Sequence, residues 1–206
     1  MERAGGRYSE ERRNEIFEAA LAVLAERGYR DASMLEVAHR AHASKETLYS
    51  WFGDKGGLFE QLVSWQAERL DEALAISLEP GGGEARTVLR AFAVELLRLL
   101  LWERAVVINR VAISEYPADP AFARILTSKG RGTVVPKLVR YLEEQRSRGR
   151  LRFHNAEYAA EVFVGLIVGD MQVRRLLGSL PEPEPAQVEA RARRAVEDFR
   201  KLFATG

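Results

Sequence analysis

The segment ASKETLYSWFGDK, residues 43–55, brings hydroxyl, aromatic and charged side chains together in one short helix. At 100° per residue, Leu48 and Phe52 share one side of that helix, which must then face the core. Polar and aromatic residues occupy the other side and its edges, namely Lys45, Glu46, Thr47, Tyr49, Ser50 and Trp51. Such a mixture suits contacts to base edges and to the sugar–phosphate backbone. The pattern indicates a surface that reads nucleic acid.

Two lysines of this segment stand where a helix does not favour them. Lys45 and Lys55 each lie in a first helical turn, where a cation opposes the macrodipole and costs roughly 0.3 kcal/mol or more. A phosphate removes the conflict, because it attracts both the ammonium and the free N–H groups of the helix end. The alternative is that both lysines are ordinary surface residues and that Tyr49 and Trp51 pack against the first helix.

Three helices are expected before residue 54. Ser9 should cap the first helix, and Gly28 should close it. Ser33 and Glu36 fit a capping box that begins the second helix. Ser44 should cap the third. The three-residue turn between the second and third helices is the layout of a helix-turn-helix module.

Helical periodicity continues through the remaining residues, and no segment reads as a confident strand. The expected fold is therefore all-α. A loop, EPGGGE, should end the fourth helix, and Gly130, Gly132 and Pro136 should break or kink a later one. The further helices are expected over residues 85–102, 104–115, 119–147, 156–177 and 186–203.

Gly56 and Gly57 occupy the first turn of the fourth helix, after a cap at Asp54. Each glycine weakens a helix by roughly 1 kcal/mol relative to alanine. The pair therefore predicts a flexible joint between the parts of the chain on either side.

Composition and motifs exclude several classes of protein. With 206 residues and 47% hydrophobic residues, the chain can bury a real core. Its 31 basic and 30 acidic residues do not by themselves indicate a nucleic-acid partner. No cysteine is present, which excludes disulfides, thiolate zinc sites and cysteine nucleophiles. The absence of a long apolar run and of a signal-peptide pattern predicts a cytoplasmic protein without a membrane span.

Enzymatic chemistry is not expected. The three histidines, His39, His42 and His154, are widely separated in the sequence. Metal-ligand spacing, a nucleophile elbow and a phosphate-binding glycine loop are all missing, so neither a cofactor nor a metal is predicted.

The segment DASMLEVAHRAHASKETLYSWFGDKGGLFEQL, residues 31–62, resembles the DNA-binding domain of the tetracycline-repressor (TetR) family. The shared pattern has a hydroxyl residue before the second helix, an A-x-x-A helix, S-K-x-T-L-Y on the recognition helix, an aromatic residue before Phe, then x-x-K and L-F. The resemblance covers about residues 9–60. It implies phosphate contacts from Ser33, Tyr49, Trp51 and Lys55, and base-edge or nearby backbone contacts from Lys45, Glu46, Thr47 and Ser50.

Three residues depart from the family pattern. His42 replaces the usual turn glycine, so a left-handed backbone there would be strained or avoided. Glu46 replaces a small residue and either accepts from a cytosine amino group or repels phosphate. Trp51 replaces Tyr or His. The operator sequence therefore cannot be transferred from the family.

The resemblance also implies a homodimer in which the last two helices pair with their counterparts as a four-helix bundle. Small residues among apolar ones in AAEVFVGLIVGDMQV support close helix packing. The expected interface contains Ala160, Phe163, Gly165, Gly169 and Asp170, with Asp170 paired to Arg174 or to an arginine of the partner. The alternative is a core helix of the monomer.

A ligand pocket is implied among the fourth to eighth helices. An apolar lining would favour a hydrophobic or amphipathic small molecule. Each candidate position also fits ordinary core packing. The candidates are Trp65, Leu96, Leu100, Asn109, Ile113, Tyr116, Phe122 and Met171.

These observations predict a homodimeric, ligand-responsive regulator that binds a double-stranded DNA operator, most simply a repressor released by a small apolar or amphipathic effector. Residues 1–8 are expected to form a flexible arm, residues 9–54 the helix-turn-helix DNA-binding domain, and residues 55–206 a helical ligand-binding and dimerisation domain. The alternative is a helical ligand-binding or scaffold protein without DNA-binding activity.

Overall fold

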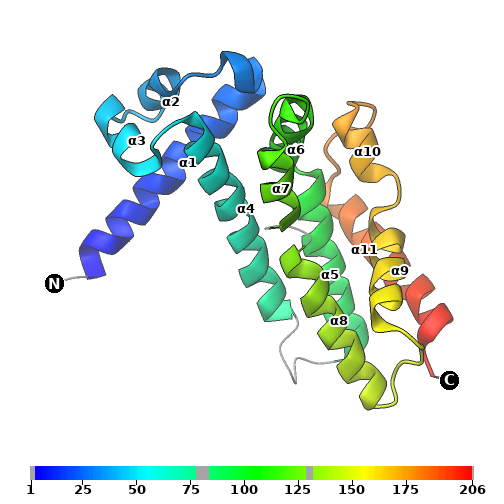
Figure 1. The fold of residues 1–206 in the computed structure, drawn as a ribbon. Helices are drawn as coiled ribbons and strands as arrows, with labels where there is room; N and C mark the ends of the chain where they lie inside the picture. Colours follow the sequence, from blue (N-terminus) through cyan, green and yellow to red (C-terminus); the bar gives the residue numbers. More distant parts are fainter. Residues whose placement is uncertain (1–2, 78–83, 129–131, 206) are drawn as a thin grey trace. The chain divides into compact units, whose positions relative to one another are not determined.

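The protein is described by a computed structural model that covers residues 3–77, 84–128 and 132–205. Within these ranges the regular secondary structure is helical (Figure 1). The β-type pairing in the same ranges is one isolated bridge between Leu151 and Ala204. The expected all-α fold is confirmed.

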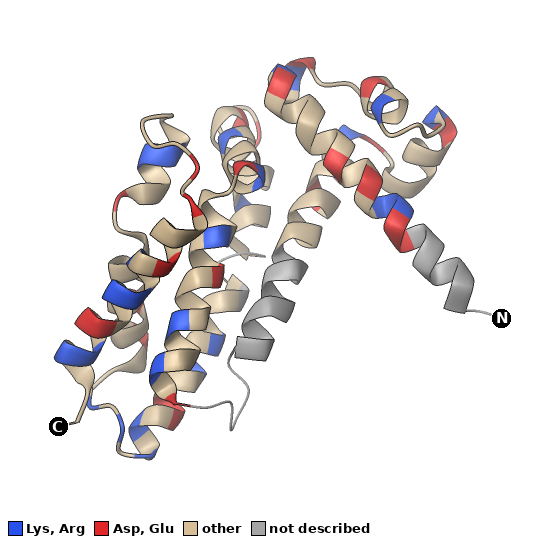
Figure 2. Cartoon of the chain, turned by 180° about the vertical axis from the view of Figure 1, so that it is seen from behind, with Lys and Arg blue, Asp and Glu red and all other residues tan. Residues whose placement is uncertain are grey.

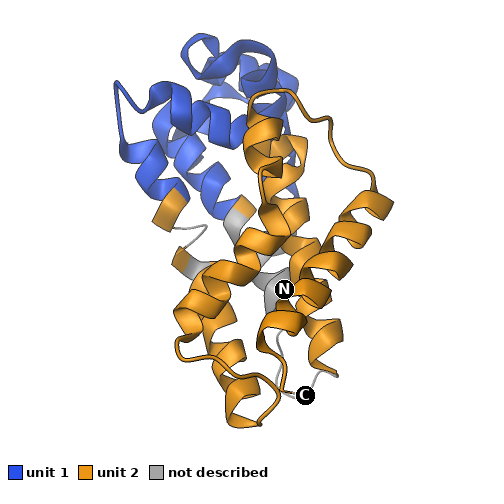
Figure 3. Ribbon diagram, turned by 90° about the vertical axis from the view of Figure 1, so that its right-hand side faces the viewer, with its two compact units in different colours: residues 1–65, 107–126 blue, residues 66–106, 127–206 orange. Residues whose placement is uncertain are grey.

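The chain divides into two compact units (Figure 3). Unit 1 contains residues 1–65 and 107–126, and unit 2 contains residues 66–106 and 127–206. Helices α4 (Lys55–Ser77) and α6 (Glu103–Glu115) each contribute to both units. The second half of α6 and helix α7 (Ala121–Leu126) therefore share a core with the N-terminal helices.

Unit 1 begins with α1 (Arg3–Asp31), α2 (Met34–Arg40) and α3 (Lys45–Phe52). The expectation that Ser9 caps α1 is wrong, because the helix already begins at Arg3. Gly28 does interrupt it, with φ 72° and ψ 178°, a conformation that glycine adopts without steric cost. The three-helix layout expected of a helix-turn-helix module is confirmed.

Side chains cap these helices at the positions that the sequence indicates. The Ser33 hydroxyl accepts from the Glu36 amide at 3.2 Å at the start of α2, and Ser44 accepts from the Thr47 amide at 3.0 Å at the start of α3. Asp54 accepts from the Gly57 amide at 2.8 Å at the start of α4. Each bond satisfies a free N–H of a first helical turn, which is why the helices begin there.

Gly57 permits a close approach between α3 and α4. A Cβ atom at this position would lie 2.1 Å from the main-chain oxygen of Phe52, the last residue of α3. At Gly56 the nearest atom is the side-chain Oδ1 of Asp54, at 3.2 Å. Gly57 is thus required by packing, which differs from the flexible joint expected for the pair.

Unit 2 is built from α5 (Ala85–Leu101), α8 (Gly132–Ser147), α9 (Ala156–Val168), α10 (Met171–Leu176) and α11 (Pro185–Phe203). Helix α11 packs against α5 and α9, and α8 packs against α9. Phe163 lies at the centre of this core, with ring centroids 4.7 Å from Phe199 and 6.1 Å from Phe92.

Two long helices expected from the sequence are each divided. Residues 119–147 contain α7 and α8, and Pro136 lies inside α8. Residues 156–177 contain α9 and α10, because Gly169 takes φ 53° and ψ −130° and ends α9. The expected loop at residues 79–84 and the break at Gly130 lie outside the described residues, except for Glu84, which precedes α5.

Candidate nucleic-acid interface

Helix α3 presents a polar and aromatic surface from unit 1. Leu48 and Phe52 are buried, as the helical periodicity predicts. On the opposite side Tyr49 is 45% exposed and Trp51 is 39% exposed, so neither ring is packed into the core. Lys45, Glu46 and Ser50 are exposed as well, and Thr47 is half-buried. The structure brings together all six residues that the sequence assigns to this face.

The turn between α2 and α3 is left-handed at His42, which has φ 48°. The alternative that histidine avoids this conformation is thereby excluded. The Arg12 guanidinium of α1 donates to the His42 carbonyl oxygen, and the Ala43 amide donates to the Ala38 oxygen at 2.9 Å. These bonds hold the turn in a backbone region that costs a non-glycine residue energy.

Helix α2 is anchored to α1 by two ion pairs. Arg40 donates to both carboxylate oxygens of Glu26, at 2.7 and 2.6 Å, and Arg27 Nε donates to Glu36 at 3.0 Å. The hydrogen bond from Arg40 also lowers the pKa of Glu26. Because these partners are 9 and 14 residues apart, their pairing could not be recognised from helical spacing alone.

Three residues near this surface were not indicated by the sequence pattern. Arg12 holds the turn from a distance of 30 residues, and Arg40 orients α2. Leu35 is 64% exposed beside the Ser33 cap, off the buried face that Met34, Val37 and Ala38 form. The signal in the sequence was an apolar residue off the helical face that Met34, Val37 and Ala38 share.

Glu46 interacts with the start of its own helix. A hydrogen bond with its own backbone amide, followed by one with the Ser44 hydroxyl, lowers the pKa of this carboxyl. An anion in a first turn also interacts favourably with the helix dipole. These contacts favour a role at the helix start, and base reading by Glu46 stays a prediction.

Lys55 has a different environment from the one expected. Its ammonium donates to the main-chain carbonyls of Tyr29 and Arg30, at the end of α1, and of Ala32, between α1 and α2. A lysine whose donors are used in this way is not prepared for a phosphate. The expected phosphate contact is therefore not supported. Lys45 is exposed on α3, with its Nζ 5.5 Å from the Tyr49 ring centroid.

Charge alone would not have identified this surface. Figure 2 shows both signs of charge on α1, α2 and α3. Residues 1–60 contain 9 basic and 11 acidic residues, a net charge of −2. Attraction to DNA must then come from the placement of individual cations and helix ends.

The proposed dimer contacts need correction. Ala160 and Phe163 are fully buried in the core of unit 2, so they cannot contact a partner, and the alternative of a monomer core position holds for them. Gly169 lies at the helix break, where a Cβ would be 2.7 Å from a guanidinium nitrogen of Arg191. Gly165 and Asp170 are exposed, and Asp170 pairs with Arg174 at 3.9 Å.

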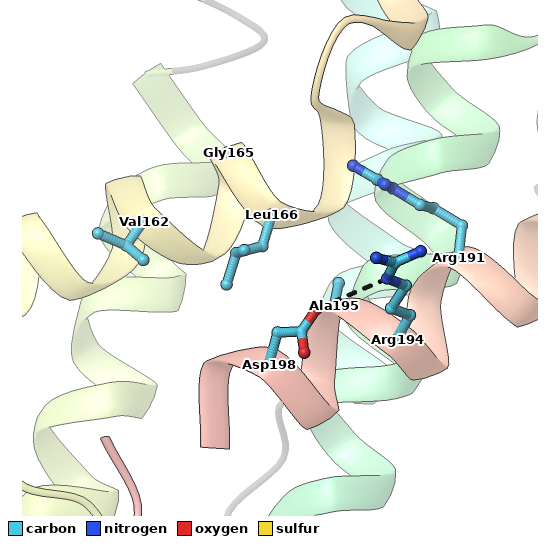
Figure 4. A pocket seen from close by; sticks show the side chains of 7 residues that line it. All are labelled: Val162, Gly165, Leu166, Arg191, Arg194, Ala195 and Asp198. Carbon is cyan, nitrogen blue, oxygen red and sulfur yellow. Dashed lines mark ion pairs between the residues drawn. The ribbon is translucent and has the colours of Figure 1, made fainter. Parts of the chain in front are cut away.

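An open groove of about 450 Å³ lies between α9 and α11 (Figure 4). Gly165 and Ala195 take up little of its space, and Arg194 Nε lies 3.7 Å from Asp198 Oδ2 across one turn of α11. A hydrogen bond from Lys201 lowers the pKa of Asp198. The groove is lined by Val162, Gly165, Leu166, Arg191, Arg194, Ala195 and Asp198.

The candidate ligand-binding residues do not gather in one unit. Trp65, Asn109, Ile113, Tyr116 and Phe122 belong to unit 1, and Leu96, Leu100 and Met171 belong to unit 2. Trp65 and Phe122 are buried in aromatic contacts with Phe17 and Tyr29, at 5.2 and 4.8 Å between centroids. Ile113 and Tyr116 are 61% and 60% exposed. Two of these side chains are thus packed in the core and two face solvent. Unit 1 by itself therefore gives no support for a pocket wall formed by Trp65, Ile113, Tyr116 and Phe122.

The described part of the chain holds neither a metal site nor a membrane span. No three acidic or histidine side chains there gather in a way that could hold a metal ion. None of the described helices has both the length and the apolar character that a membrane span needs.

The three N-terminal helices, the turn at His42 and the exposed face of α3 define a helix-turn-helix protein. Comparison with known proteins agrees: residues 16–62 match the tetR family of bacterial regulatory proteins, and residues 87–205 match the C-terminal domain of AefR-like transcriptional repressors. The chain therefore belongs to the TetR family, and the resemblance seen in residues 31–62 is confirmed.

Individual relatives extend this similarity. Over 92 residues the chain is 36% identical to the helix-turn-helix transcriptional repressor SCO4008 of Streptomyces coelicolor. The match covers 43% of this chain and 47%, or about half, of the length of that repressor. A TetR transcriptional regulator from Agrobacterium tumefaciens is 32% identical, with 94% of this chain and 95% of that chain covered and a TM-score of 0.71. The flavonoid-responsive regulator FrrA is 27% identical, with 95% and 98% covered and a TM-score of 0.70.

Proposed function

We propose that this protein is a ligand-responsive transcriptional regulator, a repressor that binds a double-stranded DNA operator through α3. The observation that carries the proposal is the exposed face of α3, which holds polar and aromatic residues opposite the buried Leu48 and Phe52. A helix of this kind fits the major groove, where base edges are distinguished by hydrogen bonds.

The DNA contacts are divided by chemistry. Ser33, Tyr49 and Trp51 contact phosphates and hold the module on the duplex, and Lys45, Glu46, Thr47 and Ser50 reach base edges or the adjacent backbone. This assigns DNA binding to residues 9–54 and effector binding and dimerisation to residues 55–206. The exposure of these side chains on one module supports the assignment.

Dimerisation uses the groove between α9 and α11. Its small residues, Gly165 and Ala195, allow close approach of another helix, and its rim carries both arginine and aspartate. An isologous contact repeats each charge on both sides, so Arg194 of one copy can meet Asp198 of the other. The two copies of α3 would then reach half-sites roughly 34–36 Å apart, one helical turn of DNA.

The effector is an apolar or amphipathic small molecule. The responsiveness of FrrA to a flavonoid supports this class, because that protein covers the full fold. Leu96, Leu100 and Met171, which all belong to unit 2, remain the candidate contacts. The effector would act by favouring a spacing of the two α3 helices that the operator does not fit. Such a regulator is not an enzyme and works in the cytoplasm, where the chromosome lies.

A mobility-shift assay with genomic fragments tests the proposal. The wild-type protein should bind and shift specific fragments. An excess of random duplexes of equal length should not displace these fragments from the protein. Tyr49→Ala should no longer bind these fragments, whereas Tyr116→Ala, which removes an exposed tyrosine from outside α3, should still bind them. The proposal fails if no fragment is retained, and such a result would favour a helical ligand-binding or scaffold protein without DNA-binding activity.

A further inference from the structure

Lys55 binds three main-chain carbonyls where α1 ends and the connection to α2 begins. Its Nζ donates to the oxygens of Tyr29 at 2.7 Å, Arg30 at 3.2 Å and Ala32 at 3.0 Å. An ammonium has three donors, so these bonds use all of them. The Nζ atom also lies 4.4 Å from the centroid of the Tyr29 ring, where a cation is attracted to the π face. The cation is thus enclosed by the protein itself.

The carbonyls that Lys55 binds belong to the segment that determines where α2 begins. α1 ends at Asp31, so the carbonyls of its last residues have no amide one turn further along the helix and need donors from elsewhere. Ser33 follows directly and caps α2, which packs against α3. A displacement of residues 29–32 would therefore reach Ser33 and α2.

The same segment is held from its other side by α6 and α7. The Tyr29 ring lies 4.8 Å from Phe122 between centroids, and Arg30 Nε lies 3.4 Å from Glu115. Burial raises the pKa of Tyr29 to about 12, so the phenol stays neutral beside the ammonium. The contacts of Lys55, together with those of α6 and α7, therefore restrict the movement of residues 29–32.

We propose that Lys55 is a positioning residue, which orients Ser33 and α2 for DNA binding through the carbonyls of residues 29–32 and does not itself contact phosphate. The inference rests on the proposed function. A phosphate contact requires a positive charge, which arginine also supplies. The carbonyl site requires three donors that diverge from one nitrogen, and the planar guanidinium of arginine cannot supply that geometry.

Lys55→Arg and Lys55→Met separate the two roles when binding to the operator and to random duplex is measured at several salt concentrations. We expect both variants to bind the operator roughly tenfold more weakly, which corresponds to about 1.4 kcal/mol. Binding to random duplex should weaken as well, because Ser33 contacts phosphate, whereas the salt slope should stay unchanged, because no cation is lost from the DNA. The matched control is Lys45→Met, which removes an exposed lysine of α3 and should lower the slope by about 0.9 for each cation lost from the DNA.

Wild-type operator affinity of Lys55→Arg would overturn the proposal, and so would a reduced salt slope for Lys55→Met. Amide hydrogen exchange of the DNA-free protein gives a second readout. Residues 30–36 should exchange faster in both Lys55 variants and at the wild-type rate in Lys45→Met; unchanged protection in Lys55→Arg would also overturn it. Since exchange needs no DNA, its outcome is independent of whether the proposed function is correct. If Lys55→Met does not fold, Lys55→Arg decides.

Discussion

Replacing Gly57 by alanine should weaken the joint between α3 and α4, and the same change at Gly56 should not. A Cβ atom added at Gly57 would start 2.1 Å from the Phe52 oxygen, about 1 Å closer than such atoms approach, so the backbone must move. Overpacking of this kind costs about 1–3 kcal/mol. At Gly56 the contact is 3.2 Å to the side-chain oxygen of Asp54 that caps α4, which has to move by only a few tenths of an ångström.

Both substitutions gain the same helix propensity, about 0.5–1 kcal/mol. The difference between the two variants therefore isolates the clash. Urea unfolding at one fixed protein concentration should give Gly57→Ala a free energy of unfolding about 1–3 kcal/mol below that of Gly56→Ala. Equal unfolding curves would refute the reasoning, because they would mean that Phe52 and Gly57 are not in close contact in solution.

Three more predictions concern separate parts of the molecule. Gly165→Leu should fill the groove between α9 and α11 and convert a dimer to a monomer; an unchanged dimer mass in light scattering rejects this. Glu46→Ala should alter the preferred base at one position of each half-site when duplexes are selected from a randomised pool. If wild type and variant prefer the same bases, Glu46 does not read a base and acts only at the start of α3. For Tyr29, burial raises the pKa from 10.0 to about 12, so its contribution to stability is complete below pH 10 and lost as the pH rises to about 12. Tyr29→Phe should show a smaller decrease in the free energy of urea unfolding over this alkaline range. A decrease as large as that of the wild type would contradict the prediction.

Local signals were sufficient for the caps of α2, α3 and α4, although not for the start of α1, which begins at Arg3 and not after Ser9. Ser33, Ser44 and Asp54 cap helices as the sequence indicates, because capping depends on residues only three positions apart. The exposed face of α3 followed from helical periodicity for the same reason. The left-handed turn at His42 depends on a bond from Arg12, and a contact 30 residues away leaves no local pattern.

Predictions that required knowledge of packing were less successful. Alanine and phenylalanine occur in protein cores and in interfaces alike, so the sequence could not distinguish the two environments for Ala160 and Phe163. Their burial within unit 2 depends on how α5 and α11 pack around them. Gly169 fits the pattern of a small residue for close helix contact, whereas its positive φ ends α9. The carbonyl contacts of Lys55 were not foreseen, because no sequence pattern reveals which donors reach the last carbonyls of α1.

Selection of duplexes from a randomised pool by the purified full-length protein tests the central claim most directly. The account predicts enrichment of an inverted repeat whose half-site centres are about 10–10.5 base pairs apart or a multiple of that spacing, since two copies of α3 related by a two-fold axis must enter the major groove. A pool that stays random after repeated rounds, or an enriched sequence that survives with equal affinity when Thr47 and Ser50 are both replaced by alanine, would contradict it.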